Sequence, residues 1–534
     1  MNWATRSKKI EPGTFLPRTW VLLIVFLCLN MTGCPARFVG PGSVVMIIES
    51  SPNNLDLRQG TDAQSERVGG LIFDALVKKD EHFELLPWLA TSWEQPDPLT
   101  WVFHLRDGVR FHDGRPLEAE DVAYTIRSLI DGSLVTAKGG NFASVDKVEV
   151  RDRLIVVVRT KRPDAGLLFN MSDGLFGVVP RGAGRDFGLH PIGSGPFRFV
   201  SAVQDKEVIV ERNHDYWAGI PPVPAGAQRI ERIRFQVVPD TITSALELEK
   251  GSADLASNVV TPDMVHRLET RPNLKVESGP GSPVIYLTFN VADPLLRDKR
   301  VRQAVACAID RQPIVDAIWR GQARLANTLL PSEHWAAATA ADLALYPHDV
   351  ARAKRQLDEA GFPVRKDGVR MRLTMKTSTD ETTRLMAAVL QQQLRAVGIR
   401  LEIQSMEFGT FYSDVTKGAF QIYGLRWIGS NEDPDIFRYA YGSKSFPPKG
   451  GNRGHYSNIR VDDLLADAAS QDRVVRKADY LEVQRILSEG LPSIPMWYPN
   501  NEIVHTRRIA NVRPRVSGTF DFLLDAEVTG DAEH

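Results

Sequence analysis

Short runs of β-branched and aromatic residues recur along the chain and predict β-strands. Such side chains suit the pleated, half-buried surface of a sheet, and Gly, Pro, Asn and Asp residues between the runs mark turns. The predicted strands are Val44–Ile48, Trp101–Leu105, Leu154–Arg159, Val208–Glu211, Arg229–Val237, Val284–Phe289, Arg370–Lys376, Arg400–Ser405 and Phe420–Leu425.

Helical patterning occupies segments between these strands. Gly361 and Gly398 directly follow two of the segments and are typical helix stops. Strands interleaved with helices favour an α/β architecture in more than one lobe. The predicted helices are Glu118–Ile130, Thr241–Glu249, Lys299–Ile309, Val350–Glu359, Thr382–Val397, Val461–Ala469 and Arg473–Leu487.

The most apolar stretch of the chain is Trp20–Leu29, and basic residues such as Arg6 and Arg18 precede it. Its length fits the roughly 7–15 apolar residues of a secretory signal peptide and falls short of the ~20 that a membrane-spanning helix needs. No later segment approaches about 18 consecutive apolar residues, so we expect the rest of the protein to be soluble.

A cysteine follows this apolar stretch in the sequence "MTGC", which resembles the lipobox of bacterial lipoproteins. The resemblance implies cleavage after Gly33 and lipid attachment to Cys34, because several acyl chains anchor a protein where one does not. The alternative is a plain signal peptide with a coincidental cysteine. We expect residues 1–33 to be a signal peptide and residues 34–42, rich in Pro and Gly, to be a lipidated tether.

Composition excludes several classes of protein. The 534 residues predict about three or four structural units. Lys and Arg number 65 and Asp and Glu 66, so the net charge of -1 gives no basis for nucleic-acid binding. Of the three cysteines, only Cys307 lies beyond the N-terminal segment. It cannot form an internal disulfide, and its apolar surroundings predict a buried hydrophobic side chain.

No catalytic constellation is present in the sequence. The G-x-S-x-G, H-E-x-x-H and phosphate-loop motifs are all absent. We therefore expect no catalytic residues, no metal and no cofactor, and we do not expect an enzyme.

The segment "LRWIGSNEDPDIFRYAYGS", residues 425–443, combines aromatic rings with carboxylates after a predicted strand. Ligands of α/β folds usually bind at such strand ends. Asp433, held extended by Pro434, could receive an ammonium group beside aromatic rings. Alternatively, Asp433 caps the following helical turn while the aromatic residues fill the core. A third alternative, in which Asp433 and Asp435 form an acid–base pair, is poorly supported by their spacing.

The chain resembles the family 5 solute-binding proteins of bacterial ABC importers, which include dipeptide and oligopeptide binders. Similar motifs occur in order along nearly the whole mature chain: "LLPWLATSWEQPDPLTWVFHLRDGVRFHDGRPLEAEDVAYTI", "PIGSGPFRF", "ERNHDYW", "VIYLTFN", "DKRVRQAVACAIDR", "YSNIRVDDLL" and "LPSIPMWYP".

This resemblance implies a two-lobed α/β fold like that of periplasmic binding proteins, of type II, with an extra subdomain in lobe I and a hinge between the lobes. Lobe I would comprise residues 43–280 and a return with the C-terminal tail, residues 492–534. Lobe II would comprise residues 281–491.

The resemblance also implies a site. "WIGSNEDPDIF" is similar to the corresponding segment of dipeptide binders, so Asp433 would receive the peptide ammonium group. Trp427, Gly429, Asn431 and Tyr286 would be the other ligand-binding residues. The loop expected to supply a carboxylate-binding arginine reads "MKTSTDETTR", in which Lys376 is the nearest cation. The group that holds a ligand carboxylate, and the peptide length, therefore stay open.

The expected function is capture of a di- or oligopeptide and delivery to an ABC permease and ATPase complex. The protein would be a monomer outside the cytoplasmic membrane, in the periplasm or on the outer face, bound to the membrane through its lipid and with no nucleic-acid partner. Alternatives with the same fold are binding of a nickel chelate, haem or glycan, and a sensor that signals to a receptor. A secreted hydrolase is a further rival.

Overall fold

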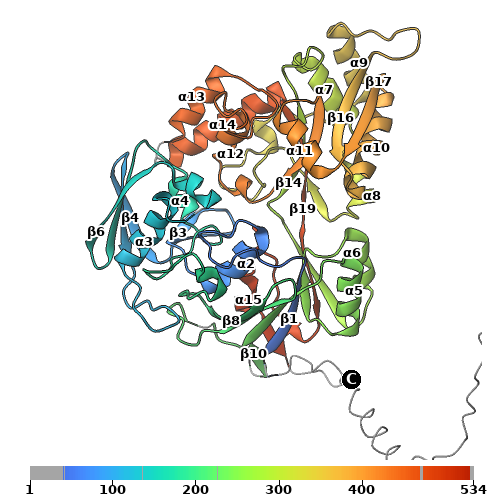
Figure 1. Cartoon of the computed structure of the whole chain (residues 1–534). Coiled ribbons are helices and arrows are strands. Elements are labelled where there is room, and N and C mark those ends of the chain that lie inside the picture. Colours follow the sequence, from blue (N-terminus) through green and yellow to red (C-terminus); the bar gives the residue numbers. More distant parts are fainter. Residues whose placement is uncertain are drawn as a thin grey trace, which may run out of the picture. The chain divides into compact units, whose positions relative to one another are not determined.

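The computed structural model describes Gly40 and residues 42–134, 136–219, 221–224, 226–469 and 473–529. In this part of the chain the strands form five sheets, and the two largest define two lobes (Figure 1). Every strand and helix predicted from the sequence overlaps a strand or helix of the structure, and the predicted strand Arg229–Val237 covers the end of one strand and the whole of another.

Lobe I is built on a seven-stranded sheet with the order β13-β20-β12-β1-β11-β9-β8. All six residues of β1 are buried, and β1 runs parallel to β11 with Ser43 opposite Arg232. The strands are β1 (Ser43–Ile48), β8 (Phe197–Val203), β9 (Glu207–Arg212), β11 (Arg232–Val237), β12 (Leu255–Ser257), β13 (Leu274–Gly279) and β20 (Asn501–Thr506).

Helices cover this sheet. Buried residues of α2 and α15 join its strands in one core cluster, and α5 and α6 contact β12, β13 and β20. The helices are α2 (Ala63–Ile72), α5 (Thr241–Lys250), α6 (Pro262–Glu269) and α15 (Phe522–Asp525). A separate three-stranded sheet has the order β10 (Ala227–Arg229), β22 (Glu527–Thr529) and β21 (Ile509–Ala510).

A subdomain of lobe I has its own core around a four-stranded sheet. The sheet order is β4 (Ala90–Asp97), β5 (Thr100–Leu105), β7 (Ile155–Thr160) and β6 (Val145–Asp152). Its helices are α3 (Ala119–Ile130), α4 (Leu167–Asn170) and η1 (Ala137–Phe142). The short helix η2 (Phe187–Leu189) packs through Phe187 on the core of the seven-stranded sheet instead. A two-stranded ribbon, β2 (Val77–Lys79) and β3 (Leu85–Pro87), also belongs to lobe I.

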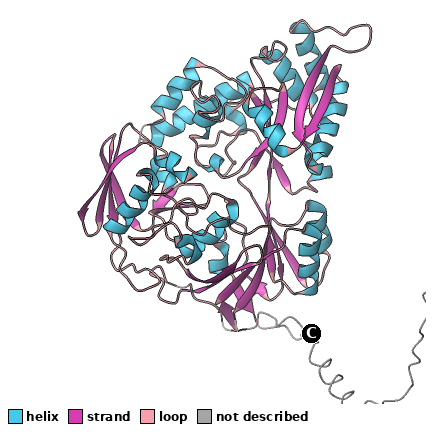
Figure 2. Ribbon diagram, viewed as in Figure 1, coloured by secondary structure: helices cyan, strands magenta, loops and turns pink. Residues whose placement is uncertain are grey.

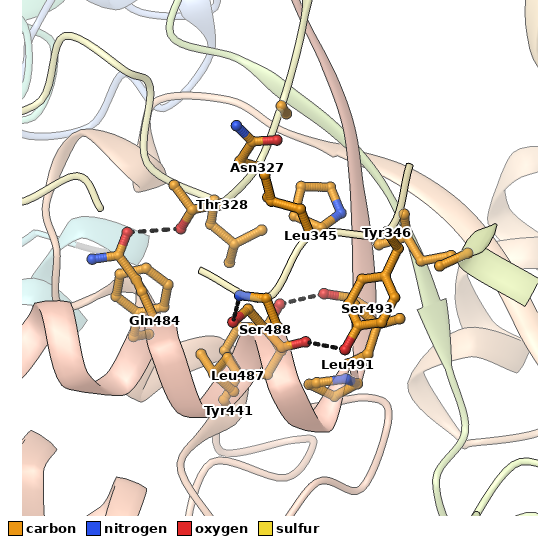
Figure 3. Close-up of a pocket in the computed structure, with 18 of the residues that line it drawn as sticks. Asn327, Thr328, Leu345, Tyr346, Tyr441, Gln484, Leu487, Ser488, Leu491 and Ser493 are labelled. Carbon is orange, nitrogen blue, oxygen red and sulfur yellow. Dashed lines mark hydrogen bonds between the residues drawn. The ribbon is translucent and has the colours of Figure 1, made fainter. Parts of the chain in front are cut away.

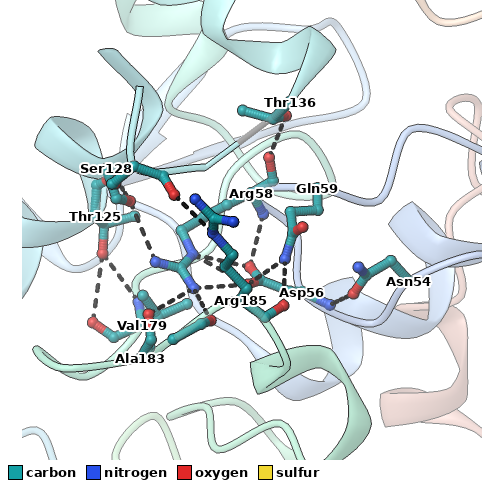
Figure 4. Close-up of polar contacts among 12 residues, drawn as sticks. Asn54, Asp56, Arg58, Gln59, Thr125, Ser128, Thr136, Val179, Ala183 and Arg185 are labelled. Atoms are coloured by element: carbon teal, nitrogen blue, oxygen red, sulfur yellow. Dashed lines mark hydrogen bonds and ion pairs between the residues drawn. The ribbon is translucent and has the colours of Figure 1, made fainter. Parts of the chain in front are cut away.

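A buried arginine joins the subdomain to the rest of lobe I (Figure 4). Arg58 pairs with Asp56 at 2.7 Å, and both side chains are almost fully buried. Arg58 also donates to the hydroxyl of Ser128 on α3 and to the carbonyl of Ala183. Because a buried charge is costly without partners, this arrangement ties the three segments together.

Lobe II is built on a six-stranded sheet with helices on both faces (Figure 2). The strand order is β15 (Ala323–Leu325), β19 (Ser493–Pro499), β14 (Val284–Phe289), β18 (Ile422–Trp427), β16 (Met371–Ser378) and β17 (Ile399–Met406). Cys307 is completely buried in the core beneath one face, as the sequence predicts.

The helices of lobe II fall into two groups. Those that contribute to the core containing Cys307 are α7 (Lys299–Ala308), α8 (Gln312–Ile318), α9 (Val350–Glu359) and α10 (Glu381–Arg395). Those that contribute to the other clusters are α11 (Phe408–Thr416), α12 (Ile436–Tyr441), α13 (Ile459–Asp467) and α14 (Arg473–Gly490). Short turns η3 (Ala340–Asp342) and η4 (Ser430–Glu432) complete the lobe.

The chain crosses between the two large sheets twice, after β13 and after β19. The second crossing lies at Asn500, because Ser493–Pro499 pairs with β14 and β15 in lobe II. The chain therefore returns to lobe I later than residue 492, where the sequence predicted the return. The crossings touch: a Cβ built on Gly281 would lie 2.2 Å from the Pro499 carbonyl oxygen.

Candidate functional site

The segment singled out in the sequence begins at the carboxyl end of β18, next to the first crossing. Trp427, the last residue of β18, pairs with Val284, the first residue of β14. η4 follows directly, then Asp433 and α12. The predicted position at a strand end is therefore confirmed.

The rings of Trp427 and Tyr286, two of the residues predicted to bind the ligand, lie against each other. Their rings stack with centroids 5.6 Å apart and planes at 11°. The Tyr439 ring meets Trp427 edge-on at 5.9 Å. Tyr286 is buried, Trp427 is half-buried and Tyr439 is 44% exposed. The rings of Trp427 and Tyr439 are thus partly accessible from outside, while the buried Tyr286 ring packs against Trp427.

Gly429 and Asn431 shape the turn after β18. Gly429 has φ +72°, a left-handed conformation that favours glycine, and open space surrounds the position of a Cβ. Asn431 is fully buried, and its Nδ2 donates to the carbonyls of Ser282 at 2.6 Å and Leu329 at 3.1 Å. The side chain of Asn431 therefore fastens the segment to the first crossing.

Asp433 is half-buried, and one of its oxygens is already engaged. Its Oδ1 accepts a hydrogen bond from the backbone N–H of Asp435 at 2.9 Å, as in the capping alternative. Its Oδ2 would lie 3.4 Å from a Cβ built on Gly166 of lobe I. Burial, together with the nearby Asp435 carboxylate, raises the pKa of Asp433 to about 6. A cation near Oδ2 would stabilise the ionised carboxylate and so lower this pKa again.

Glu432 joins the two lobes, a role that the sequence did not suggest. Its Oε2 lies 3.0 Å from Nζ of Lys79 on β2, and both side chains are 6% exposed. Its Oε1 accepts from the hydroxyl of Ser282 at 2.9 Å. His334 Nε2 lies 3.1 Å from its carbonyl oxygen. Burial lowers the pKa of His334 to about 3, so a neutral imidazole donates this bond.

Other contacts between the lobes surround this ion pair. The ring of Phe83, between β2 and β3, stacks on His334 at 5.6 Å. The backbone N–H of Trp335 donates to the carbonyl of His82 at 3.1 Å. Arg473 on α14 donates to Glu84 at 2.6 Å. The ribbon of lobe I thus rests directly on lobe II.

The cation suggested for a ligand carboxylate is already occupied. Lys376 Nζ lies 2.6 Å from Asp414. Arg384 lies exposed on α10. Among the described residues, no cluster of three or more His, Cys, Asp or Glu side chains is arranged to hold a metal ion. Within the same residues, no helix has both the length and the apolar character needed to cross a membrane.

A cavity of about 60 Å³ lies inside lobe II (Figure 3). Thr328 donates to Gln484 beside it at 2.8 Å, and Tyr346 donates to the Ser488 carbonyl at 3.0 Å. None of the predicted site residues lines this cavity. Ligand pockets usually measure about 300–1,000 Å³, so this space suits only a few water molecules.

Comparison with known proteins identifies the fold and the family. Residues 84–447 match the family model for bacterial extracellular solute-binding proteins, family 5. The chain is 27% identical to the oligopeptide-binding protein AppA of Bacillus subtilis, over 86% of this chain and 87% of AppA. It is 26% identical to di/tripeptide-binding protein 1 of Pseudomonas aeruginosa, over 88% of this chain and 92% of that protein.

Solved structures show the same fold. HbpA2 from Haemophilus parasuis superposes with a TM-score of 0.80 at 23% identity, over 91% of this chain and 99% of HbpA2. AppA from Bacillus subtilis, solved in complex with a nonapeptide, gives a TM-score of 0.71 at 24% identity, over 92% and 99%. These structures share the two-lobed architecture expected from the sequence. The chain belongs to the family 5 bacterial extracellular solute-binding proteins.

Proposed function

We propose that this protein is the receptor of an ABC importer and that it captures peptides between its two lobes. The similarity to peptide-binding relatives over most of both chains carries the proposal. The protein performs no reaction of its own. It acts as a monomer outside the cytoplasmic membrane and delivers its ligand to a permease whose ATPase drives transport.

The site would bind the ammonium group of the peptide and the apolar side chains of the peptide. Asp433 would accept the ammonium, because a half-buried carboxylate with a raised pKa gains from a nearby cation. Trp427 and Tyr439 offer ring surface within the same segment. Gly429 leaves open space beside them. Tyr286 and Asn431 would act indirectly, by holding Trp427 and the turn in place.

Calorimetric titration of the full chain with di-, tri- and pentapeptides tests the proposal. We expect a dissociation constant near one micromolar, about -8 kcal/mol, for at least one peptide length. Acetylation of the peptide N-terminus should weaken binding. If no peptide binds while nickel-histidine, haem or a glycan does, the peptide assignment is wrong.

Lipid anchoring through Cys34 is a second part of the proposal. Residues 1–33 and Cys34 lie outside the described residues. Support comes from the sequence, where "TGC" follows a short apolar stretch. We expect Cys34→Ser to abolish labelling by a radioactive fatty acid and to release the protein from membranes, while Cys307→Ser leaves both unchanged. Labelling of the Cys34→Ser protein would contradict lipid attachment at this residue.

A further inference from the structure

A second cavity, which we call the lobe I cavity, measures about 170 Å³, and every residue that lines it belongs to lobe I. Much of the lining comes from the loop after β9 and from residues 515–525. The lining reaches the protein surface at Ala218, Gly219 and Pro221, which are exposed. None of the residues predicted to bind the peptide lines this cavity. A ligand could therefore enter it without any change between the lobes.

The lining includes a buried cation, Arg212, whose hydrogen-bonding capacity is not fully used. Its side chain is 3% exposed, and its Nη2 has no hydrogen-bond partner among the described residues. Its Nε donates to the Ile230 carbonyl at 2.6 Å. A carboxylate oxygen of Glu231 lies 4.0 Å from this Nε, but the other oxygen of Glu231 lies 2.9 Å from Nε2 of His214. Glu231 therefore offsets little of the buried charge.

Other buried arginines of the molecule have more acceptors. Arg58 pairs with Asp56 at 2.7 Å. Arg302 donates to four backbone carbonyls. Burial lowers the pKa of Arg212 and of Arg302 to about 10, so both stay charged at neutral pH. Because a buried charge with an unused N–H is costly, the environment of Arg212 favours an acceptor supplied from outside the chain.

The other charged groups of the lining are paired with one another. Arg515 lies 2.6 Å from Asp525 and 3.6 Å from Asp521. Nζ of Lys78 lies 3.8 Å from Asp521. Together with Arg212, the lining holds three cations and two carboxylates, which leaves an excess of one positive charge. A ligand with a single negative charge would balance this excess.

Aromatic and aliphatic side chains form another part of the lining. Nε1 of Trp88 donates to Oδ1 of Asp74 at 2.8 Å, and the Tyr216 hydroxyl donates to the same oxygen at 2.9 Å. Because these polar atoms are engaged, the two rings and the side chain of Leu524 offer apolar contacts to a ligand. A cavity of about 150 Å³ in another protein holds benzene, so the lobe I cavity has room for a ligand of that size.

We propose that the lobe I cavity binds a small organic monocarboxylate, such as an aromatic acid of the size of benzoate. The carboxylate would accept hydrogen bonds from the guanidinium of Arg212, and the ring would lie against Trp88 and Tyr216. Hydrogen bonds between charged groups are roughly twice as strong as those between neutral groups. This site goes beyond peptide capture and does not depend on it, since the cleft between the lobes contributes none of its residues.

Calorimetric titration of the full chain with benzoate, and with benzamide as a neutral analogue of the same shape, tests this inference. We expect benzoate to bind with a dissociation constant of about 1 mM or lower, and at least about tenfold more tightly than benzamide. Inorganic phosphate has no apolar part and should not displace benzoate. Absence of benzoate binding, equal binding of the two probes, or displacement by phosphate would overturn the inference.

Substitution of Arg212 tests where the carboxylate binds. Arg212→Met should remove the preference for benzoate over benzamide. Arg302→Met is the matched control in lobe II, because both arginines are 5% exposed, and it should retain the preference. Thermal unfolding shows which variants are folded. A folded Arg212→Met protein that still prefers benzoate would contradict the proposed role of this residue.

A second variant leaves Arg212 and its bond to Ile230 in place. Ala218→Trp, at the exposed mouth of the cavity, should fill the cavity and abolish benzoate binding. Ala202→Trp, at an exposed position of β8 in the same lobe, should bind benzoate like the wild type. Full affinity of Ala218→Trp for benzoate would place the ligand elsewhere and overturn the inference.

Discussion

The carboxyl group of Asp433 faces charged neighbours of both signs. The carboxylates of Asp435 and Asp164 repel the charge of Asp433, and the guanidinium of Arg476 attracts it. Burial is the main reason that the pKa of Asp433 is raised to about 6. In the unfolded chain this pKa is about 3.9. The folded protein therefore binds the proton more tightly than the unfolded chain does.

This raised pKa predicts a pH-dependent effect of Asp433→Asn. Tighter proton binding at Asp433 contributes to the free energy of unfolding. This contribution is fully present below about pH 4 and is lost as the pH rises through about 6. We expect the variant to unfold at a higher temperature than the wild type at pH 7.5 and at the same temperature at pH 4, as measured by calorimetry. Glu381→Gln, at an exposed acid on α10, is the control.

The same substitution should weaken ligand binding at neutral pH. An ammonium group needs the ionised carboxylate, so wild-type affinity for peptides should fall between pH 7 and pH 5. Asp433→Asn should lower affinity at least about tenfold at pH 7 and remove this pH dependence. Unchanged affinity would exclude Asp433 from the site and leave it as the cap of the turn before α12.

Individual residues show why only part of the candidate site could be predicted from the sequence. Trp427 and Tyr286 could be named because they lie in or beside recognisable sequence segments. Glu432 could not, because its partner Lys79 is 353 positions away. Asn431 was predicted to bind the ligand, and its buried side chain donates to the carbonyls of Ser282 and Leu329, whose proximity is a property of the fold.

Among the elements, strands with continuous β-branched sequence were predictable, whereas β19 was not. Its sequence "SIPMWYP" contains Pro495 and Pro499, which usually indicate an edge or a loop. In the structure β19 lies between β14 and β15, with a register shift between Ile285 and Tyr286, opposite Pro495. The irregular pairing accommodates a proline that the local sequence alone would exclude from a central strand.

The contact between the two crossings predicts a strong effect of Gly281→Ala. A Cβ there would lie 2.2 Å from the Pro499 carbonyl oxygen, so the crossing strands must separate. Overpacking of this kind lowers the free energy of unfolding by about 1–3 kcal/mol. We expect a lower free energy of unfolding in urea titrations. Gly184→Ala should be nearly neutral, because Gly184 has open space at its Cβ position. Equal stability of the two variants would contradict this account.

On the scale of the whole molecule, the Lys79–Glu432 pair holds the lobes together. Both side chains are 6% exposed, so removal of one partner leaves the other as a buried unpaired charge, at a cost of about 3–5 kcal/mol. Because separation of the lobes would return that charge to water, we expect Lys79→Met to increase the radius of gyration measured by X-ray scattering and to weaken ligand binding.

A double variant provides the control for this prediction. Lys79→Met combined with Glu432→Gln removes both charges and should recover most of the compact form, since no unpaired ion remains. If Lys79→Met alone scatters like the wild type at every pH and salt concentration tested, the ion pair does not govern the separation of the lobes.

Lobe II is inserted into the chain of lobe I, and the two ends of the insertion lie side by side. β14 and β19, which begin and end lobe II, are paired neighbours, with Ile285 opposite Trp497. An inserted domain whose ends lie side by side can be exchanged or enlarged while its host keeps its own fold. Recombination could therefore exchange the whole of lobe II in a single genetic event and leave lobe I unaltered.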